Sequence, residues 1–103
     1  MAGRTLKVPN AVRDLSRRLH PALKRKVRAA LNDILDDPAC GKPLERELTG
    51  YRSLRIGRHR VIYRPDQAGA EIVAIGPRRT IYEETVAVIA RNRRESPERE
   101  ADR

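Results

Sequence analysis

The sequence predicts an α+β fold in which a small antiparallel sheet packs against an N-terminal helical hairpin. Hydrophobic residues recur at helical spacing between residues 10 and 36, at every second position from residue 51, and again at helical spacing after residue 83. The elements should therefore follow the order strand, helix, helix, three strands, helix. With 103 residues, of which 39% are hydrophobic and 36% charged, the chain has the size and composition of one folded domain.

The N-terminal part of the chain is expected to form one short strand and one helix. Polar and apolar residues alternate over residues 4–8 up to Pro9, which cannot donate a hydrogen bond within a sheet. Asn10 is the expected cap of a helix that ends before the His20-Pro21 pair. The apolar face of this helix holds Val12, Leu15 and Leu19.

A second helix, over residues 21–36, has the clearest helical pattern in the sequence. Pro21 suits its first position because the N–H that proline lacks would have no partner inside the helix. The two helices predict a helical hairpin that lays one apolar stripe on a sheet. In the second helix this stripe consists of Leu23, Val27, Ala30, Leu31, Ile34 and Leu35.

Two arginine-rich strands are expected over residues 51–56 and 59–64, after a polar link at residues 44–50. Gly57-Arg58 between them suits a type II′ turn, since glycine readily adopts the positive φ of the first turn position. This turn fixes the register of the hairpin, so that Arg55 faces Arg60. The other expected pairs are Ile56 with His59, Leu54 with Val61, Ser53 with Ile62 and Arg52 with Tyr63.

The register divides the side chains of these two strands between two faces. The face expected to pack on the helices holds Leu54, Ile56, Val61 and Tyr63. The opposite face holds Tyr51, Arg55, Arg60, Ile62 and Arg64. Two arginines that face each other directly repel, so a negatively charged partner is expected between Arg55 and Arg60.

The last strand and the last helix complete the expected domain. Residues 71–76, EIVAIG, are nearly all apolar, which is typical of a central, buried strand. Helical spacing then returns over residues 83–94. Residues 1–94 therefore predict a single domain, and the polar residues 95–103 predict a frayed, disordered tail.

The positive charge of the chain indicates a polyanionic partner. The net charge is +9, and residues 51–64 contain five arginines and no acidic residue. Nucleic acid is the first candidate because arginine neutralises phosphate; a solvated face that only aids solubility is the alternative. The lack of Phe and Trp argues against a single-strand binder built on stacked aromatic residues.

The cysteine count and the lack of long apolar segments indicate the cellular compartment in which the protein works. One cysteine, Cys40, can form neither an internal disulfide nor a zinc site, which fits a reducing compartment. No apolar run approaches the roughly 20 residues that span a bilayer, and the first twenty residues lack a secretory pattern. The expected location is therefore the cytoplasm, with no membrane contact.

The arginines of the hairpin and the residues after the third strand form a candidate phosphodiester site. Guanidinium groups bind phosphate through paired donors, and Tyr82 offers either a proton-transfer group or a base-stacking surface. Cleavage of RNA by internal attack needs a deprotonated 2′-OH, a stabilised phosphorane and a protonated 5′ oxygen. Arginine is a poor acid and tyrosine a feeble base near neutrality. Slow intrinsic chemistry, helped by substrate positioning from elsewhere, is therefore expected.

Three other reactive side chains have simpler structural roles. His59 has a better-matched ordinary pKa of about 6.5, but strand alternation places it away from Arg60. His20 precedes Pro21 and is expected to cap the second helix. Cys40 has no nearby histidine or acid in the sequence that would make it a nucleophile.

The tyrosines are also open to two interpretations. Tyr51 is expected at the start of a strand, and Tyr63 is expected to be a half-buried strand residue. Tyr82 follows the Arg78-Arg79 pair closely, which favours a functional role; anchoring the last helix in the core is the alternative.

The order of the elements and two sequence segments resemble the RelE/ParE toxin superfamily. The segments are GYRSLRIGRHRVIYR and IGPRRTIYEE, and the resemblance extends from about residue 4 to residue 90. Members of the RelE branch are toxins of toxin–antitoxin pairs that cut mRNA in the ribosomal A site, which implies a metal-independent endoribonuclease without cofactors. The resemblance implies that Arg60 stabilises the transition state, Arg78 donates a proton, and Tyr82 orients or activates the 2′-OH. Arg79 is the alternative to Arg78.

The resemblance also suggests further phosphate contacts on the basic strands. Where the family often has a second basic side chain, this sequence has Ser53, so either Arg52 compensates or that contact is missing. The expected contacts to RNA phosphates are Arg52, Arg55, Arg58, Arg64 and Arg79.

Two partners follow from the resemblance. The first is an antitoxin whose acidic or amphipathic segment covers the basic face or displaces the last helix. The second is the ribosome with its mRNA. The ParE branch shares the scaffold but binds DNA gyrase and lacks the ribonuclease residues. The combination of Arg60, Arg78 and Tyr82 favours the RelE branch, and a ParE-like toxin or an inactive RNA-binding homologue is the alternative.

Overall fold

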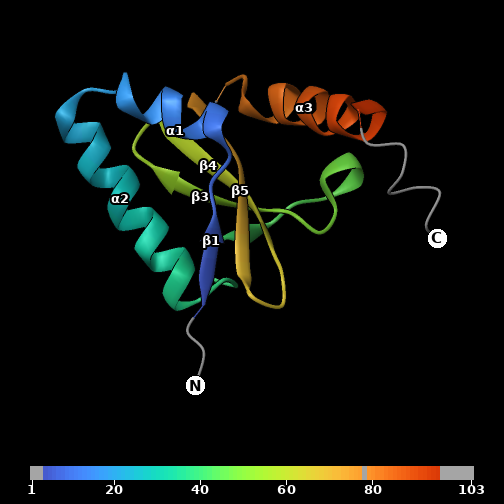
Figure 1. Cartoon of the computed structure of the whole chain (residues 1–103), viewed down its shortest axis with the longest axis horizontal. Coiled ribbons are helices and arrows are strands. Elements are labelled where there is room, and N and C mark those ends of the chain that lie inside the picture. Colours follow the sequence, from blue (N-terminus) through green and yellow to red (C-terminus); the bar gives the residue numbers. More distant parts are fainter. Residues whose placement is uncertain (1–3, 78, 96–103) are drawn as a thin grey trace.

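A five-stranded sheet lies between a helical hairpin and a C-terminal helix in the computed structural model, which describes residues 4–77 and 79–95 (Figure 1). The helices are α1 (Asn10–Arg17), α2 (Pro21–Asp36) and α3 (Ile81–Glu95). The strands are β1 (Thr5–Lys7), β2 (Lys42–Pro43), β3 (Arg52–Ile56), β4 (His59–Pro65) and β5 (Gly69–Pro77), in the spatial order β1-β5-β4-β3-β2. The tail beyond Glu95 lies outside the described residues, so the predicted disorder of the tail stays a prediction.

The predicted α+β class and the order of the main elements are confirmed, with two additions. The sheet is mixed rather than purely antiparallel, because β1 pairs with β5 in parallel. The polar link contains the 3₁₀ helix η1 (Arg46–Leu48) and follows the two-residue strand β2, which pairs with the start of β3. β5 is internal as predicted, although the middle strand of the sheet is β4.

The predicted register of the β3–β4 hairpin is confirmed at all five pairs, including Arg55 opposite Arg60. Gly57 has a φ of 65°, and Arg58 is not among the residues with positive φ. Positive φ at the first turn position alone fits the type II′ turn that the sequence predicts. Because this turn sets the register, it decides which arginines share a face.

The two ends of α2 are held by side chains. The predicted cap at His20 is confirmed, since His20 Nδ1 accepts a hydrogen bond from the backbone N–H of Ala22 at 3.2 Å. At the other end, the Arg4 guanidinium donates to the carbonyls of Leu35 and Asp36. These contacts satisfy backbone groups that a helix terminus leaves without partners.

The predicted cap of α1 is wrong. Asn10 is the first helical residue, and Pro9 before it takes the extended capping conformation without a side-chain hydrogen bond. Proline has a fixed φ and no N–H, so it can start the helix without a polar side chain. The carbonyl of Pro9 accepts from the N–H groups of Val12 and Arg13, both at 3.0 Å. Leu15 of the predicted apolar face remains 39% exposed, so α1 contributes mainly Val12 to the core.

The main core lies between the sheet and the α1–α2 hairpin, as the predicted face of the two strands requires. Tyr63 is fully buried in it, so the prediction of a half-buried Tyr63 is wrong. The buried members of this core are Val12, Val27, Ala30, Ile34, Ile56, Val61, Tyr63, Ala70, Ile72 and Ile75.

Helix α3 covers the opposite face of the sheet. Ile62 of β4 and Ile81 of α3 are buried on this side, outside the main core cluster. A Cβ at Gly76 would lie 2.9 Å from Ile81 Cδ1, so glycine allows the start of α3 to approach β5 closely. Thr85 is buried and donates from its hydroxyl to the Ile81 carbonyl at 2.6 Å. The first turn of α3 is therefore fixed against the sheet, next to Arg60.

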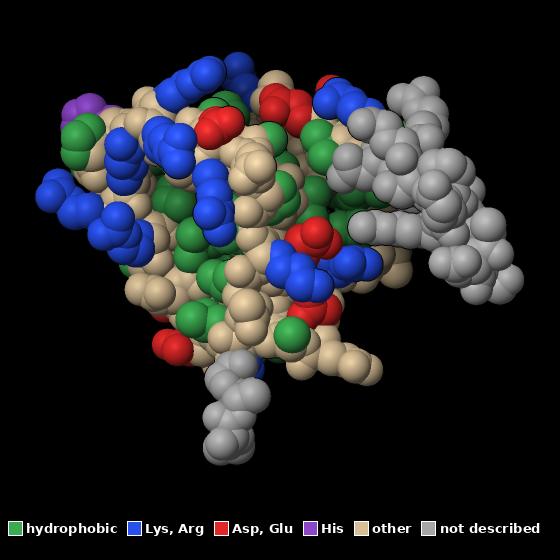
Figure 2. All heavy atoms as spheres, viewed as in Figure 1, with side chains coloured by type: hydrophobic (Ala, Val, Ile, Leu, Met, Phe, Trp, Pro, Cys, Tyr) green, Lys and Arg blue, Asp and Glu red, His purple; other side chains and the backbone are tan. Residues whose placement is uncertain are grey.

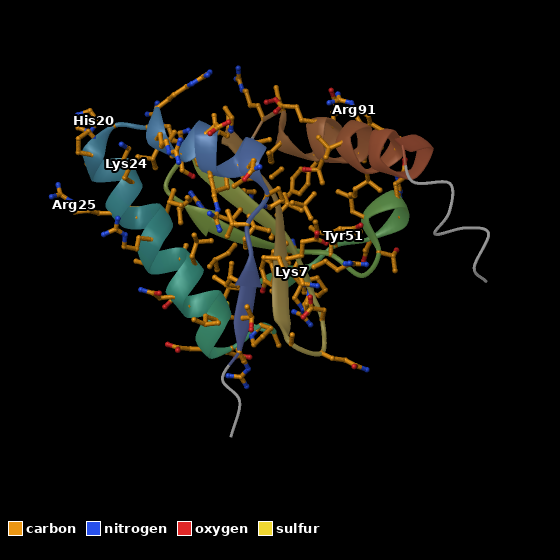
Figure 3. The ribbon with its side chains drawn as sticks, viewed as in Figure 1. Lys7, His20, Lys24, Arg25, Tyr51 and Arg91 are labelled. Atoms are coloured by element: carbon orange, nitrogen blue, oxygen red, sulfur yellow. The ribbon has the colours of Figure 1, made fainter. Side chains whose placement is uncertain are left out.

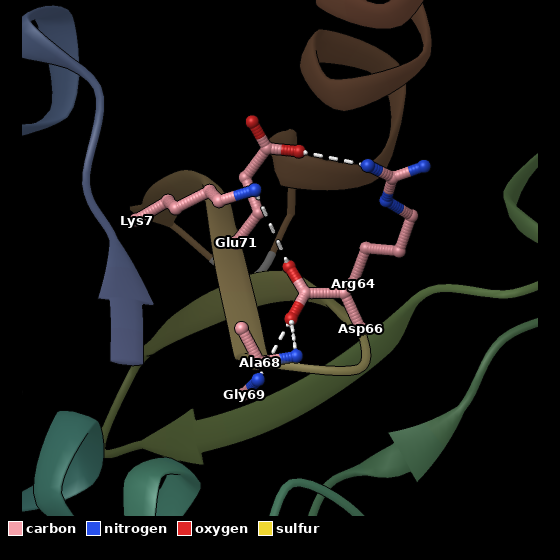
Figure 4. Close-up of polar contacts among 6 residues, drawn as sticks. All are labelled: Lys7, Arg64, Asp66, Ala68, Gly69 and Glu71. Atoms are coloured by element: carbon pink, nitrogen blue, oxygen red, sulfur yellow. Dashed lines mark hydrogen bonds and ion pairs between the residues drawn. The ribbon is translucent and has the colours of Figure 1, made fainter. Parts of the chain in front are cut away.

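The β4–β5 turn is joined to β1 by polar contacts (Figure 4). Asp66 accepts hydrogen bonds from the backbone N–H groups of Ala68 at 2.9 Å and Gly69 at 2.7 Å, and it forms an ion pair with Lys7 at 3.8 Å. This arrangement places the N-terminal strand beside β5. Among the described residues, no helix has the length and apolar character needed to cross a membrane.

Candidate anion-binding site

The confirmed hairpin register places Arg55 and Arg60 opposite each other on the side of the sheet that faces α3. Arg55 is exposed and Arg60 is half-buried. Neither guanidinium forms an ion pair with a carboxylate of the described residues. Two adjacent positive charges without an acidic partner repel, so this pair is best stabilised by an anion from outside the chain.

Three features fix the environment of Arg60. Its Nη1 donates a hydrogen bond to the hydroxyl of Ser53 at 3.1 Å. Its Nε is buried and has no hydrogen-bond partner. Its Cζ lies 5.9 Å from the centre of the Tyr82 ring, within the range of a cation–π contact. Arg60 is therefore held on two sides, while one of its donors is left without a partner.

Tyr82 reaches this position from the first turn of α3. Tyr82 is half-buried. The preceding residue, Ile81, is buried and anchors the helix against the sheet. Two of the three predicted catalytic residues, Arg60 and Tyr82, are thus brought together. The third, Arg78, lies outside the described residues.

A shallow hollow of about 460 Å³ lies next to the hairpin turn. Arg79 arrives from the segment after β5, and Arg55 and Arg58 arrive from the hairpin. The hollow is lined by Arg55, Gly57, Arg58, Pro77 and Arg79. Three of the predicted phosphate-binding arginines therefore line one surface, to which they contribute mainly the apolar parts of their side chains.

Two other predicted phosphate contacts already have partners within the chain. Arg52 donates to the backbone carbonyls of Ala39 at 3.1 Å and Gly41 at 2.6 Å, and strand alternation places it on the face away from Arg60. Arg64 forms an ion pair with Glu71 at 3.2 Å (Figure 4). The structure does not bring either guanidinium into the hollow.

Tyr63 belongs to the core and not to the site. Its hydroxyl donates to the Pro38 carbonyl at 2.7 Å and accepts from the Gly41 N–H at 2.8 Å. Burial raises the pKa of Tyr63 to about 12, although the hydrogen bond from Gly41 works in the opposite direction. The phenol is therefore neutral over the physiological range.

The other reactive side chains also lie away from Arg60. His59 pairs with Ile56 and Pro77 at the end of the sheet, on the face of Val61 by strand alternation. The Sγ of Cys40 lies 3.9 Å from the Tyr63 hydroxyl. Tyr51 lies beside η1 at the start of β3 (Figure 3). Within residues 4–77 and 79–95, no group of three or more His, Cys, Asp or Glu side chains could hold a metal ion.

The contact of Ser53 with Arg60 was not predicted from the sequence. The predicted register places Ser53 opposite Ile62 on the basic face, without a contact for its hydroxyl. The useful signal was a small polar residue in a row of arginines, two positions before Arg55. A buried hydroxyl requires a partner, and the nearest long donor across the strands was Arg60.

Comparison with known proteins agrees with this fold. The family described as the ParE toxin of type II toxin–antitoxin systems matches residues 8–82. A chain of the toxin–antitoxin complex RelBE2 from Mycobacterium tuberculosis shares 31% identity and a TM-score of 0.65, over 75% of this chain and 100% of that chain. Comparison with curated proteins gave no match.

Two more distant structures show the same fold. The archaeal RelE–RelB complex from Pyrococcus horikoshii shares 24% identity and a TM-score of 0.64, over 77% of this chain and 98% of that chain. The free E. coli toxin RelE, with two arginines replaced by alanine, shares 18% identity and a TM-score of 0.66, over 84% of this chain and 97% of that chain. The family match over residues 8–82 and the 31% identity to the RelBE2 chain show that this chain belongs to the RelE/ParE superfamily, the toxins of type II toxin–antitoxin systems.

Proposed function

We propose that this toxin is an endoribonuclease that cleaves mRNA on the ribosome, without a metal ion. The observation that carries the proposal is the contact of Arg60 with Tyr82, on a sheet face where Arg55 lies directly opposite Arg60. A phosphate between the two guanidinium groups would remove their repulsion.

The proposed reaction is internal attack of the ribose 2′-oxygen on the adjacent phosphorus. The bond from phosphorus to the 2′-oxygen forms, the bond to the 5′-oxygen breaks, and the products are a 2′,3′-cyclic phosphate and a free 5′-hydroxyl. In this reaction Arg60 stabilises the charge of the phosphorane. Tyr82 orients the 2′-OH and, as the phenolate formed when its own proton is lost to solvent, takes up the 2′ proton; Arg78 supplies the proton to the 5′-oxygen, with Arg79 as the alternative donor.

A guanidinium group is a very weak acid, and a phenol is a poor base near neutral pH. Neither group transfers a proton readily at pH 7, so positioning has to supply much of the rate. A ribosome that holds the mRNA in a fixed conformation can supply it. This is the physical reason for proposing a ribosome-dependent enzyme, acting in the cytoplasm, rather than a nuclease of free RNA.

The phosphates beside the scissile bond are proposed to bind in the hollow next to the hairpin turn. Arg55, Arg58 and Arg79 line it, and their forked donors match the geometry of phosphate oxygens. Arg52 and Arg64 do not line this hollow, so neither is a proposed phosphate contact there, whereas Arg55 lines it and also donates from Nε to the Gly57 carbonyl at 3.3 Å.

The proposed inhibitor of this toxin is an antitoxin with an acidic or amphipathic segment. Similar chains were solved as the toxin–antitoxin complexes RelBE2, YoeB–YefM and RelE–RelB. Carboxylates can occupy the positions of phosphates on the basic face, and the partner would cover that face or displace α3. A short acidic protein encoded beside this gene would be the first candidate.

The test of the ribonuclease proposal is induction of the toxin in cells, followed by primer extension on translated mRNAs. Cuts inside codons are expected for the unaltered toxin. Arg60→Ala and Tyr82→Phe should each lose the cuts while retaining the fold by circular dichroism. Arg91→Ala is the matched control, because Arg91 is an exposed arginine of α3, outside both the basic face of the sheet and the α1–α2 hairpin, and should leave cleavage unchanged. Full cleavage by both site variants would remove Arg60 and Tyr82 from the mechanism.

Inhibition of DNA gyrase is the second candidate function, and the match to the ParE family favours it. A gyrase inhibitor would leave transcripts intact and cause gyrase-linked DNA breaks on induction. The same cultures can be examined for both products. Intact mRNA together with DNA breaks would replace the ribonuclease proposal with this one.

A further inference from the structure

We infer that Ser53 is the positioning residue for Arg60, a role that rests on the proposed function of Arg60 as the phosphate-binding group. The Ser53 hydroxyl accepts a hydrogen bond from Arg60 Nη1 at 3.1 Å across the β3–β4 hairpin. Ser53 is only 2% exposed, so its own contact with a bound RNA is blocked. Ser53 therefore acts on the substrate only through Arg60.

A hydroxyl group at position 53 is well suited to hold the Arg60 guanidinium in place. A serine hydroxyl is neutral, so it fixes one end of the guanidinium without neutralising its charge. A carboxylate at the same place would form an ion pair with Arg60 and compete with phosphate for the same donors. The structure already leaves Arg60 without an acidic partner among the described residues, and Ser53 preserves that state.

The contact also determines how Arg60 meets Tyr82. An arginine side chain has several rotatable bonds, and ordering them on substrate binding costs free energy. Ser53 holds Nη1 from β3, while Tyr82 of α3 lies 5.9 Å from Cζ. With both contacts in place the guanidinium is ordered before RNA arrives.

Three substitutions at Ser53 separate positioning from a simple packing role. Ser53→Thr keeps the hydroxyl, Ser53→Ala removes it, and Ser53→Asp replaces it with a carboxylate. We expect Ser53→Thr to keep most of the activity and Ser53→Ala to slow single-turnover cleavage roughly tenfold, the usual scale of a hydrogen bond to a charged group. Ser53→Asp should keep Arg60 ordered but weaken binding of a 2′-deoxy, non-cleavable RNA analogue. Equal behaviour of all three variants would overturn the inference.

A direct readout of Arg60 keeps this test independent of the proposed function. The ¹⁵N NMR signal of Arg60 Nε–H reports whether the guanidinium is ordered, and it needs neither RNA nor ribosomes. In Ser53→Ala this signal should shift and exchange with water faster, even if the unaltered toxin were found to cut no RNA. Loss of cleavage in the unaltered protein would refute the ribonuclease proposal alone. An unchanged Arg60 signal in Ser53→Ala would refute the role of Ser53 alone.

Thr85→Val is the matched control, because it removes another buried hydroxyl on the α3 side of the sheet without a contact to Arg60. It should leave the Arg60 signal in place. If Ser53→Ala fails to fold by circular dichroism, Ser53→Cys keeps a side chain of similar size with a much weaker acceptor. The Arg60 signal of this variant should change in the same direction, and an unchanged signal would contradict the inference.

Discussion

Arg60 has a charge that the described part of the fold does not neutralise, and such a residue is expected to lower stability. Its Nε is buried without a partner, and Arg55 lies directly opposite it. Both features destabilise the folded chain, and the repulsion between the two arginines favours binding of an anion. Arg60 thus shows the usual conflict between stability and function at a single position.

Replacement of Arg60 by Met in a Ser53→Ala background, where no buried hydroxyl loses its partner, should therefore inactivate the toxin without lowering its stability relative to Ser53→Ala. Methionine keeps much of the volume of the side chain and removes the buried, unpartnered donor. We expect the midpoint of thermal unfolding to stay equal or rise, while cleavage in the induction assay is lost. Differential scanning calorimetry of both proteins would check this, and a large fall in the midpoint would show that Arg60 is a structural residue.

The buried phenol of Tyr63 predicts a specific loss of stability at alkaline pH. The pKa of Tyr63 is about 12 in the folded chain and near 10 when unfolded. Between these pH values the unfolded chain loses the proton and the folded chain keeps it, so stability is complete below pH 10 and falls as the pH rises toward 12. Urea unfolding at pH 9 and pH 11 would measure the loss.

Tyr63→Phe is the control for that prediction. It leaves the N–H of Gly41 and the carbonyl of Pro38 without the phenol, which should cost about 1–3 kcal/mol at neutral pH. The difference in stability between the two proteins should then shrink as the pH rises from 10 to 12. A constant difference over this range would mean that Tyr63 does not titrate as the structure implies.

At the level of single residues, the sequence was most informative where strand alternation determines direction. The positions of Arg55, Arg60 and Val61 followed from the two-residue turn alone. The partners of Arg52 did not, because Ala39 and Gly41 come from a loop whose path has no periodic pattern. The full burial of Tyr63 was not predicted for the same reason. Its hydroxyl donates to the carbonyl of Pro38, which belongs to a loop without a periodic pattern.

The β3–β4 hairpin is the element on which the proposed site depends. Gly57, at a φ of 65°, holds the turn that places Arg55 opposite Arg60. A Cβ at Gly57 would meet nothing within 4 Å, so a substitution there acts through backbone strain alone. Substitutions at Gly57 therefore test directly how the turn conformation determines the position of the arginine pair.

Gly57→Asn and Gly57→Val should differ clearly in their effects. Asparagine tolerates a positive φ, whereas a β-branched side chain does not. We expect Gly57→Val to lose about 1–2 kcal/mol in urea unfolding, with reduced cleavage because the arginine pair is disturbed, and Gly57→Asn to lose much less. Equal loss in both variants would show that the turn has another conformation in solution.

Element boundaries were predictable where local chemistry determines them. Pro21 begins α2 and His20 caps it, as the sequence indicates. β2 and η1 were missed because a two-residue strand that contains Pro43 and a single turn of 3₁₀ helix show no hydrophobic period. The parallel pairing of β1 with β5 also could not be predicted from the sequence. It depends on the close approach of Thr5 to Gly69, which lie far apart in the chain.

The whole molecule has a second basic surface, on the outer side of the α1–α2 hairpin. Figure 2 shows Lys and Arg side chains gathered over these helices, and Figure 3 shows Lys24 and Arg25 pointing away from the sheet. The exposed basic residues of the hairpin are Arg13, Arg17, Arg18, Lys24, Arg25, Lys26 and Arg28. In this group only Arg17 is in an ion pair, with Asp14. The positive potential therefore extends well beyond the candidate site.

The two basic surfaces should contribute differently to RNA binding. The double variant Lys24→Ala/Arg25→Ala lowers the long-range potential and should slow association with RNA a few-fold at low salt, an effect that salt screening removes. Arg55→Ala removes a proposed phosphate contact, so it should reduce the slope of log K against log salt by about one and slow cleavage at saturating RNA. Stopped-flow binding over a salt series and single-turnover cleavage would separate the effects. If the α2 variant slowed cleavage at saturation as much as Arg55→Ala does, the chemistry would not be confined to the sheet face.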